Sequence, residues 1–103
     1  MEIHFNNAYL EKLYAGLPVS GKPRYNEDVV NKFRNKIEVL KQVDNTIQLR
    51  HFKSLNFEAL KGDKKGLYSI RVDIKYRLEF AIERNKITLH EIILVEDLSK
   101  HYR

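Results

Sequence analysis

The chain has 103 residues, of which 43% are hydrophobic and 32% charged, and this composition excludes an intrinsically disordered protein and predicts one domain over residues 1–103. No apolar run approaches the roughly 20 residues of a membrane helix, the N-terminus lacks a signal-peptide pattern, and the absence of cysteine excludes disulfides and thiolate metal sites. We therefore expect a cytoplasmic protein without a membrane partner, and the net charge of +5 favours nucleic acid or an acidic protein as partner.

Two helices are predicted in the first half of the chain. A short strand at residues 2–5 precedes an asparagine cap and a helix that ends near Gly16. Residues 17–25 contain both prolines of the chain and are typical of a loop. A longer helix begins at Asn26, and its apolar residues recur at helical spacing to form a buried stripe of Val29, Phe33, Ile37 and Leu40.

The second half of the chain predicts an antiparallel sheet. After a connection at residues 44–56, alternating apolar and polar residues indicate a hairpin over 67–80 with its turn at 73–75. A last strand is predicted at 87–95, followed by a polar tail at 96–103 that forms one helical turn. The predicted fold class is α+β, with two N-terminal helices packed on three or four antiparallel strands and a short C-terminal helix.

Side chains of a strand alternate between the two faces of a sheet, and this alternation predicts where the hairpin directs its charges. We expect Arg71 and Arg77 on one solvated face, with Glu79 beside them and Lys61 at the edge. The residues expected to face the core are Tyr68, Ile70, Val72, Tyr76, Leu78 and Phe80.

Positive charge is concentrated in this hairpin, because residues 61–77 contain six Lys and Arg residues and only two Asp residues. Several guanidinium and ammonium groups on one surface suit phosphate better than a neutral ligand. The lysines expected to bind RNA phosphates are Lys64, Lys65, Lys75 and Lys100. The alternative for Lys64 and Lys65 is a solvated turn without a ligand.

The sequence reads SLNFEALKGD at residues 54–63, GLYSIRV at 66–72 and YRLEF at 76–80. These runs resemble the RelE/ParE superfamily of bacterial toxins, and within it the HigB branch of host-killer toxins. The resemblance extends over essentially the full length of the chain and implies the RelE-like fold. It also implies a ribosome-dependent endoribonuclease that cuts messenger RNA in the ribosomal A site and so inhibits translation.

The resemblance also implies partners. A HigA-like antitoxin with a helix-turn-helix domain would neutralise the toxin, and the toxin would reach operator DNA only through that antitoxin. The ribosome itself, through its 30S rRNA, is the expected site of action. Two alternatives remain open at this stage: a ParE-like toxin that inhibits DNA gyrase without nuclease activity, and a catalytically inactive relative that binds antitoxin or nucleic acid.

RNA cleavage by attack of the 2′-OH on the adjacent phosphate needs a base, an acid and cations for the charge of the transition state. Arg71 and Arg77 are the expected charge stabilisers, because arginine stays protonated. Lys61 lies among other cations, which favours its neutral amine and makes it a candidate base. Because the sequence has no cluster of metal-ligating residues, we expect metal-free chemistry and no cofactor.

Many HigB and RelE relatives place a tyrosine or histidine just after the last strand, and here the chain reads EDLSKHY at residues 96–102. His101 and Tyr102 are therefore the candidates for the acid, and imidazole exchanges protons near neutral pH. The alternative for His101 is a frayed terminal residue. Glu58 stands where some HigB relatives have histidine, and we expect it either to act as a base or to pair with Lys61.

Overall fold

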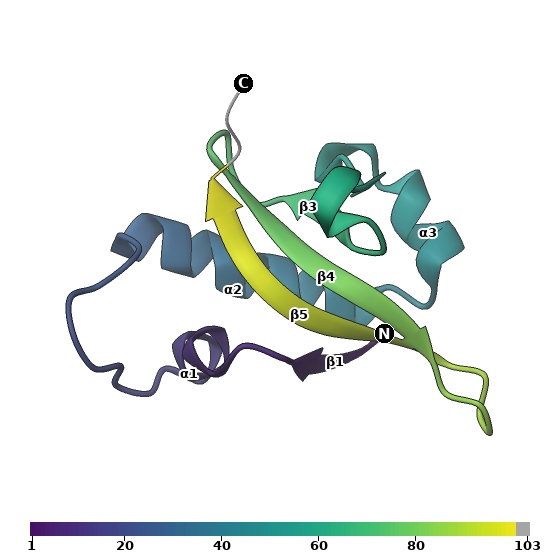
Figure 1. Ribbon diagram of the computed structural model, residues 1–103, viewed down its shortest axis with the longest axis horizontal. Helices are drawn as coiled ribbons and strands as arrows, with labels where there is room; N and C mark the ends of the chain where they lie inside the picture. Colours follow the sequence, from purple (N-terminus) through teal and green to yellow (C-terminus); the bar gives the residue numbers. More distant parts are fainter. Residues whose placement is uncertain (101–103) are drawn as a thin grey trace.

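The computed structural model describes residues 1–100, and its centre is a five-stranded sheet in the order β1-β5-β4-β3-β2 (Figure 1). The strands are β1 (Glu2–Phe5), β2 (Glu58–Ala59), β3 (Tyr68–Arg71), β4 (Tyr76–Arg84) and β5 (Glu91–Lys100). The α+β class is confirmed, and β2 to β5 are antiparallel as predicted, but the sheet has a fifth strand and is mixed. β1 pairs parallel to β5 from the opposite end of the chain, and the two-residue β2 adds a further edge.

The two predicted helices are present as α1 (Ala8–Ala15) and α2 (Glu27–Gln42). The side-chain oxygen of Asn7 accepts a hydrogen bond from the Leu10 amide, and that of Asn26 accepts one from the Val29 amide, so an asparagine caps each helix. Gly16 ends α1 in the left-handed conformation, with φ of 74°, which suits glycine. Within residues 1–100, no helix has the length and apolar character needed to cross a membrane.

The hydrophobic core lies between α2 and one face of the sheet. In Figure 1, α2 lies behind β4 and β5. The predicted stripe of α2 is confirmed, because its buried residues are Val29, Phe33, Ile37 and Leu40. They pack with the buried residues of the sheet, which are Ile70, Val72, Leu78, Phe80, Ile93, Val95 and Leu98. The helical face of the sheet is thereby filled with apolar side chains, and polar groups are left for the other face.

The connection at residues 44–56 contains a helix that the sequence did not predict, α3 (Thr46–His51), followed by the 3₁₀ turn η1 (Lys53–Leu55). Asn45 caps α3 through a hydrogen bond from the Gln48 amide. Leu49 and Leu55 are buried and attach this segment to the core. A helix of six residues with one buried leucine is too short to produce a periodic pattern.

The bounds predicted for the last strand are wrong. β5 begins at Glu91 and continues to Lys100, because its residues pair with β4 along the whole length of that strand. The predicted helical turn is therefore absent from residues 96–100, and residues 101–103 lie outside the described part. The β4–β5 turn is longer than expected, and Asn85 organises it by accepting hydrogen bonds from the amides of Ile87 and Thr88.

Three aromatic rings anchor the start of the sheet to the core. The rings of Phe57 and Tyr68 stack with centroids 5.4 Å apart, and Phe80 stacks against both. Phe80 is fully buried, whereas Tyr68 and Phe57 are half-buried. Phe57 thereby attaches the segment before β2 to the core.

We predict that Phe80→Ala lowers the free energy of unfolding by about 3–5 kcal/mol, since it opens a cavity in the core. Tyr68→Ala should lower it by less, because part of that ring is already in contact with water. Urea denaturation of the two variants and the wild type measures both values. A larger loss for Tyr68→Ala would show that the ring cluster, and not the depth of burial, decides the stability of this region.

Tyr25 joins the loop before α2 to β5. Its hydroxyl donates a 2.7 Å hydrogen bond to the carbonyl oxygen of Leu98, and its ring meets that of Tyr76 edge-on. Burial, and then the nearby carboxylate of Asp97, raises the pKa of Tyr25 to about 12. The phenol therefore keeps its proton, and with it this hydrogen bond, at all ordinary pH values.

The raised pKa of Tyr25 predicts a loss of stability at alkaline pH. Because the folded protein holds the phenol proton more tightly than the unfolded chain does, this contribution is fully present below pH 10 and is lost as the pH rises towards 12. Chemical denaturation across this range should show a steeper fall in the free energy of unfolding for the wild type than for Tyr25→Phe. Parallel curves would contradict the assignment to Tyr25.

Candidate functional site

The face of the β3–β4 hairpin opposite the core carries the predicted arginines. Arg71 is paired directly with Arg77, and Ser69 with Glu79, so the four side chains share one face of the sheet. This confirms the predicted alternation. The expectation that the face is solvated is wrong, because Arg71 is exposed while Ser69, Arg77 and Glu79 are at most 9% exposed.

Arg77 is buried because three groups surround its guanidinium. Its Nε donates a 2.8 Å hydrogen bond to the hydroxyl of Ser69, and its Nη2 donates to the backbone carbonyl of Asn56. A carboxylate oxygen of Glu58 lies 3.6 Å from Nε and balances part of the charge. Within residues 1–100, Glu58 therefore forms its ion pair with Arg77 and not with Lys61. Arg77 joins β4 to β3 and to the segment that enters β2.

The Asn56 end of this contact has an unusual backbone. Asn56 adopts a left-handed conformation with φ of 48°, which asparagine tolerates better than most residues. This conformation ends η1 and directs the Asn56 carbonyl towards Arg77. The chain then continues through Phe57, which packs inward, to Glu58 on the polar face. Local backbone geometry and the buried guanidinium together set the path of this segment.

Glu79 forms the second charged contact of this face. One of its carboxylate oxygens accepts hydrogen bonds from the ammonium of Lys64, at 2.7 Å, and from the hydroxyl of Ser99, at 2.6 Å. The hydrogen bond to Glu79 raises the pKa of Lys64 above its ordinary value, against a smaller opposing effect of burial. Lys64, predicted as a free phosphate contact, thus has a carboxylate partner in the protein.

The remaining predicted cations lie around these buried contacts. Lys61 and Lys65 flank the 3₁₀ turn η2 (Gly62–Lys64), a loop that the Leu60–Leu67 hydrogen bond closes. Lys75 lies in the β3–β4 turn, and Lys100 is opposite Tyr76 at the end of β5. All of these lysines are exposed, as is Arg71. We call Arg71 and Arg77, together with Lys61, Lys64, Lys65 and Lys75, the cationic face. Lys100 shares the core-side face of Tyr76 and is not brought together with the arginines.

The predicted acids, His101 and Tyr102, lie outside the described residues. The described part of β5 ends beside the arginines, because Ser99 pairs with Arg77. In residues 1–100, no group of three or more His, Cys, Asp or Glu side chains is arranged to hold a metal ion. The chemistry that the described arrangement can support is therefore binding and charge stabilisation of a phosphate by arginine and lysine.

Comparison with known proteins identifies the family. A family model described as the RelE-like toxin of the type II toxin-antitoxin system HigB matches residues 3–92. The chain belongs to this HigB-like family. No curated protein matches it. Among solved structures, a YoeB/ParE toxin from Agrobacterium tumefaciens has 17% identity and a TM-score of 0.57, with 99% of this chain and 100% of that chain covered. A YoeB-YefM complex from Staphylococcus aureus has 22% identity and a TM-score of 0.48, with 100% and 97% covered.

The family match and the structural likeness support different conclusions about this HigB-like chain. The matched residues 3–92 include Lys61, Arg71 and Arg77, and they end before Ser99. At 17% identity, the likeness to the Agrobacterium tumefaciens structure shows the shared fold alone. The family is thus established by the sequence match, and the roles of individual residues depend on the geometry of this chain.

Sequence reasoning missed the residues that fix the two buried charges. Strand alternation placed Ser69 and Glu79 on the polar face, but it gave neither of them a role. Their partners Asn56 and Ser99 lie in a loop and at the end of a strand whose bounds were predicted wrongly. The sequence did contain a signal for Glu79. An acidic residue two positions from Arg77 on the same strand face indicates that a nearby basic side chain pairs with it.

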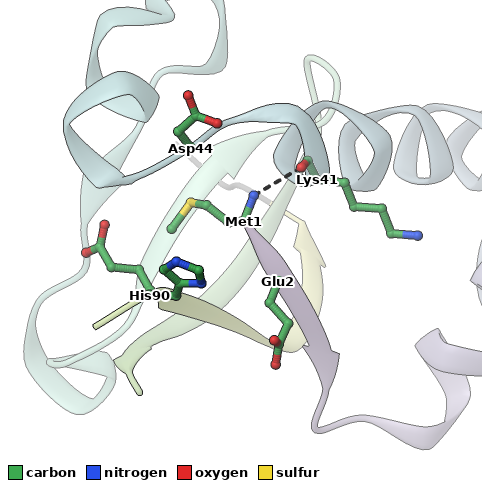
Figure 2. Close-up of a pocket in the computed structure, with 6 residues that line it drawn as sticks. Met1, Glu2, Lys41, Asp44 and His90 are labelled. Carbon is green, nitrogen blue, oxygen red and sulfur yellow. Dashed lines mark hydrogen bonds between the residues drawn. The ribbon is translucent and has the colours of Figure 1, made fainter. Parts of the chain in front are cut away.

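A separate pocket lies at the opposite end of β5. It encloses about 380 Å³ and is lined by Met1, Glu2, Lys41, Asp44, His90 and Glu91. Figure 2 shows these side chains around the opening, with the amino group of Met1 donating to the Lys41 carbonyl. Glu91 and Ser99 are at opposite ends of the ten-residue strand, so roughly 30 Å separates this pocket from the cationic face. Its mixed charges do not continue the cationic face.

We predict that Arg77→Ala lowers the free energy of unfolding by about 2–4 kcal/mol, because it leaves the Ser69 hydroxyl and the Asn56 carbonyl without their donor. Arg71→Ala is the matched control. It removes the exposed arginine opposite Arg77 on β3 and should change the free energy of unfolding by at most about 0.5 kcal/mol. Urea denaturation gives both values, and equal stability of the two variants would contradict the structural role of Arg77.

Proposed function

We propose that this HigB-like toxin is a metal-independent endoribonuclease that cuts messenger RNA in the ribosomal A site and so inhibits translation. The observation that carries the proposal is the direct pairing of Arg71 with Arg77 on one face of the sheet, bordered by exposed lysines. Two adjacent guanidinium groups suit the crowded negative charge of a phosphate under attack. Membership of a family of RelE-like toxins supports the same activity.

In this proposal the two arginines differ in their task. Arg77 is fixed by Ser69 and Asn56, and so it offers its remaining N–H donors in one geometry without losing further side-chain freedom. Arg71 is exposed, and its Nε makes a long 3.4 Å contact with the Asp73 carbonyl, so it can move to meet the RNA. Arg71 captures the phosphate and Arg77 stabilises the charge that develops on it.

Two groups are candidates for the base that takes the 2′-OH proton. Lys61 begins the η2 turn and is exposed. Glu58 is half exposed and lies 3.6 Å from Arg77, which places a carboxylate oxygen beside the proposed phosphate position. His101 and Tyr102 remain the proposed donors to the leaving 5′-oxygen. A base and an acid on opposite sides of the phosphate would complete the reaction without a metal.

The proposed partners follow from the family. A toxin of a type II toxin-antitoxin system has a protein antitoxin, and we propose a HigA-like one with a helix-turn-helix domain. An acidic segment of the antitoxin would suit a chain of net charge +5. The complex would reach operator DNA through the antitoxin, and the free toxin would act on the 30S subunit in the cytoplasm.

One alternative has a specific observation in its favour. Arg77 is engaged by three protein groups and Lys64 by a carboxylate, as in a face that stabilises the fold or binds a partner without cutting RNA. Such a protein would be a catalytically inactive relative that binds antitoxin or nucleic acid. It would retain the cationic face but show no cleavage.

The proposal predicts codon-phased cuts in a defined messenger RNA. Mapping of 5′ ends after incubation with purified toxin and translating ribosomes should reveal cuts that are absent without ribosomes. Arg71→Ala should slow cleavage by at least about tenfold through loss of a phosphate contact. The matched control is Arg84→Ala, which removes an exposed arginine from the far end of β4. This variant should cut the messenger RNA at the wild-type rate.

The other outcomes of this mapping are equally specific. Cuts on free RNA would retain the nuclease and remove the ribosome from the proposal. No cuts with folded wild-type protein in either condition would contradict the nuclease and favour the inactive relative. Equal effects of Arg71→Ala and Arg84→Ala would show that net charge, and not the paired arginines, is responsible.

A further inference from the structure

We propose that Glu79 is a positioning residue for RNA binding, whose buried carboxylate holds the Lys64 ammonium on the cationic face so that Lys64 contacts an RNA phosphate. The inference rests on the proposed function, and it adds a residue that neither the sequence nor the family assigned. The Lys64–Glu79–Ser99 contacts that carry it are all within the described residues.

The first observation is a carboxylate buried in a basic surface. The Glu79 side chain is 7% exposed and lies on the same sheet face as Arg77, two residues along β4. A buried carboxylate needs partners to offset its loss of water, and a buried ion pair contributes little to net stability compared with an apolar pair. Stability alone therefore gives a weak reason for a glutamate here, and a fixed geometry gives a stronger one.

The second observation concerns the lysine. The Lys64 side chain is 49% exposed although its ammonium is 2.7 Å from Glu79. An ammonium has three donors, and a single one is directed at the Glu79 oxygen. The hydrogen bond to Glu79 raises the pKa of Lys64, so the amine stays charged. A half-exposed, permanently charged group with donors to spare is suited to a phosphate.

The third observation is the loop that carries Lys64. The turn η2 begins at Gly62, which has φ of 65°, and the loop ends at Gly66, with φ of 99°. Lysine side chains are flexible, and a loop between two left-handed glycines adds backbone freedom. The Glu79 carboxylate attaches this loop to β4, and Ser99 attaches the same oxygen to β5. Arg77 and Glu79 are two residues apart on one face of β4, a spacing of roughly 7 Å. The Lys64 ammonium is thereby held on the same face as the Arg77 guanidinium.

Glu79 could act on RNA binding in two ways, and the two predict opposite changes in RNA affinity when its carboxylate is removed. If the carboxylate merely neutralised Lys64, its removal would free a positive charge and strengthen RNA binding. In that case the carboxylate of Asp97, the cross-strand neighbour of Glu79, would also weaken RNA binding, because it too offsets positive charge. If the carboxylate positions Lys64, its removal weakens binding even though the net charge of the protein becomes more positive. Loss of affinity on gain of positive charge is the signature of positioning.

The test uses Glu79→Gln, Lys64→Met and the double variant, with Glu83→Gln on the same strand and Lys86→Met, an exposed lysine outside the cationic face, as matched controls. Affinity for a short single-stranded RNA is measured over a range of salt concentrations. Lys64→Met should weaken binding and lower the slope of log affinity against log salt by about 0.7, the value for one phosphate contact in a single strand. Glu79→Gln should weaken binding about as much, and the double variant should be no weaker than Lys64→Met.

A second measurement follows the lysine itself, independently of RNA. In competitive labelling with an amine-reactive reagent, Lys64 should react more slowly than Lys65 in the wild type. In Glu79→Gln, Lys64 should gain reactivity several-fold while Lys65 is unchanged. Thermal unfolding of each variant identifies any that no longer fold, and Lys64→Met, whose side chain is half exposed, gives the RNA readout while the Glu79–Ser99 hydrogen bond stays in place.

The outcomes separate this inference from the proposed function. Tighter RNA binding by Glu79→Gln, additive effects in the double variant, or unchanged labelling of Lys64 would each overturn the positioning role while wild-type cleavage stands. Absence of both RNA binding and ribosome-dependent cleavage in the wild type would overturn the proposed function and the phosphate contact of Lys64 together, whatever the labelling shows.

Discussion

The buried guanidinium of Arg77 is the contact on which the organisation of the site depends. It joins three segments that are distant in the sequence: β4, the Ser69 position of β3, and the turn at Asn56 that leads into β2. A buried arginine is tolerated only where its donors find acceptors and a carboxylate is near, and here Ser69, Asn56 and Glu58 supply both. The two-residue β2 could not hold this path by backbone pairing alone.

A second charged pair repeats this arrangement one step along β4. Arg77 is balanced by Glu58 of β2, and Glu79 is balanced by Lys64 from the loop after β2. Two residues of β4 that are neighbours on one face of the sheet thus carry opposite buried charges, and each is paired with the segment from Glu58 to Lys64. The segment from Asn56 to Lys64 is attached at both ends, while the exposed Lys61 projects from it and the exposed Lys65 follows it. A rigid base with mobile cations around it is the arrangement that phosphate binding requires.

Local patterns predicted the parts of this fold that depend on local interactions. The asparagine caps, the stripe of α2 and the alternation of the hairpin were all correct, because each is decided within a few residues. The errors concern pairing at long range: β1 beside β5, and the extension of β5 to Lys100 along β4. Alternation also gives the face of a side chain and not what covers it. Arg77 was therefore assigned to the correct face and to the wrong environment, since Asn56 lies in the predicted connection at residues 44–56 and Glu58 was expected to act as a base or to pair with Lys61.

The burial of Arg77 alters how the proposed chemistry is understood, without removing the residue from it. A solvated arginine would lose side-chain freedom each time it bound a phosphate, whereas Arg77 has already lost that freedom on folding. Its Nε and one donor of Nη2 are engaged, and a guanidinium has five donors, so others are left for a ligand. Arg77 is 9% exposed, and its cross-strand neighbour Arg71 is exposed. In the proposed function, the exposed Arg71 would meet the phosphate first, and the buried Arg77 would define where it is held.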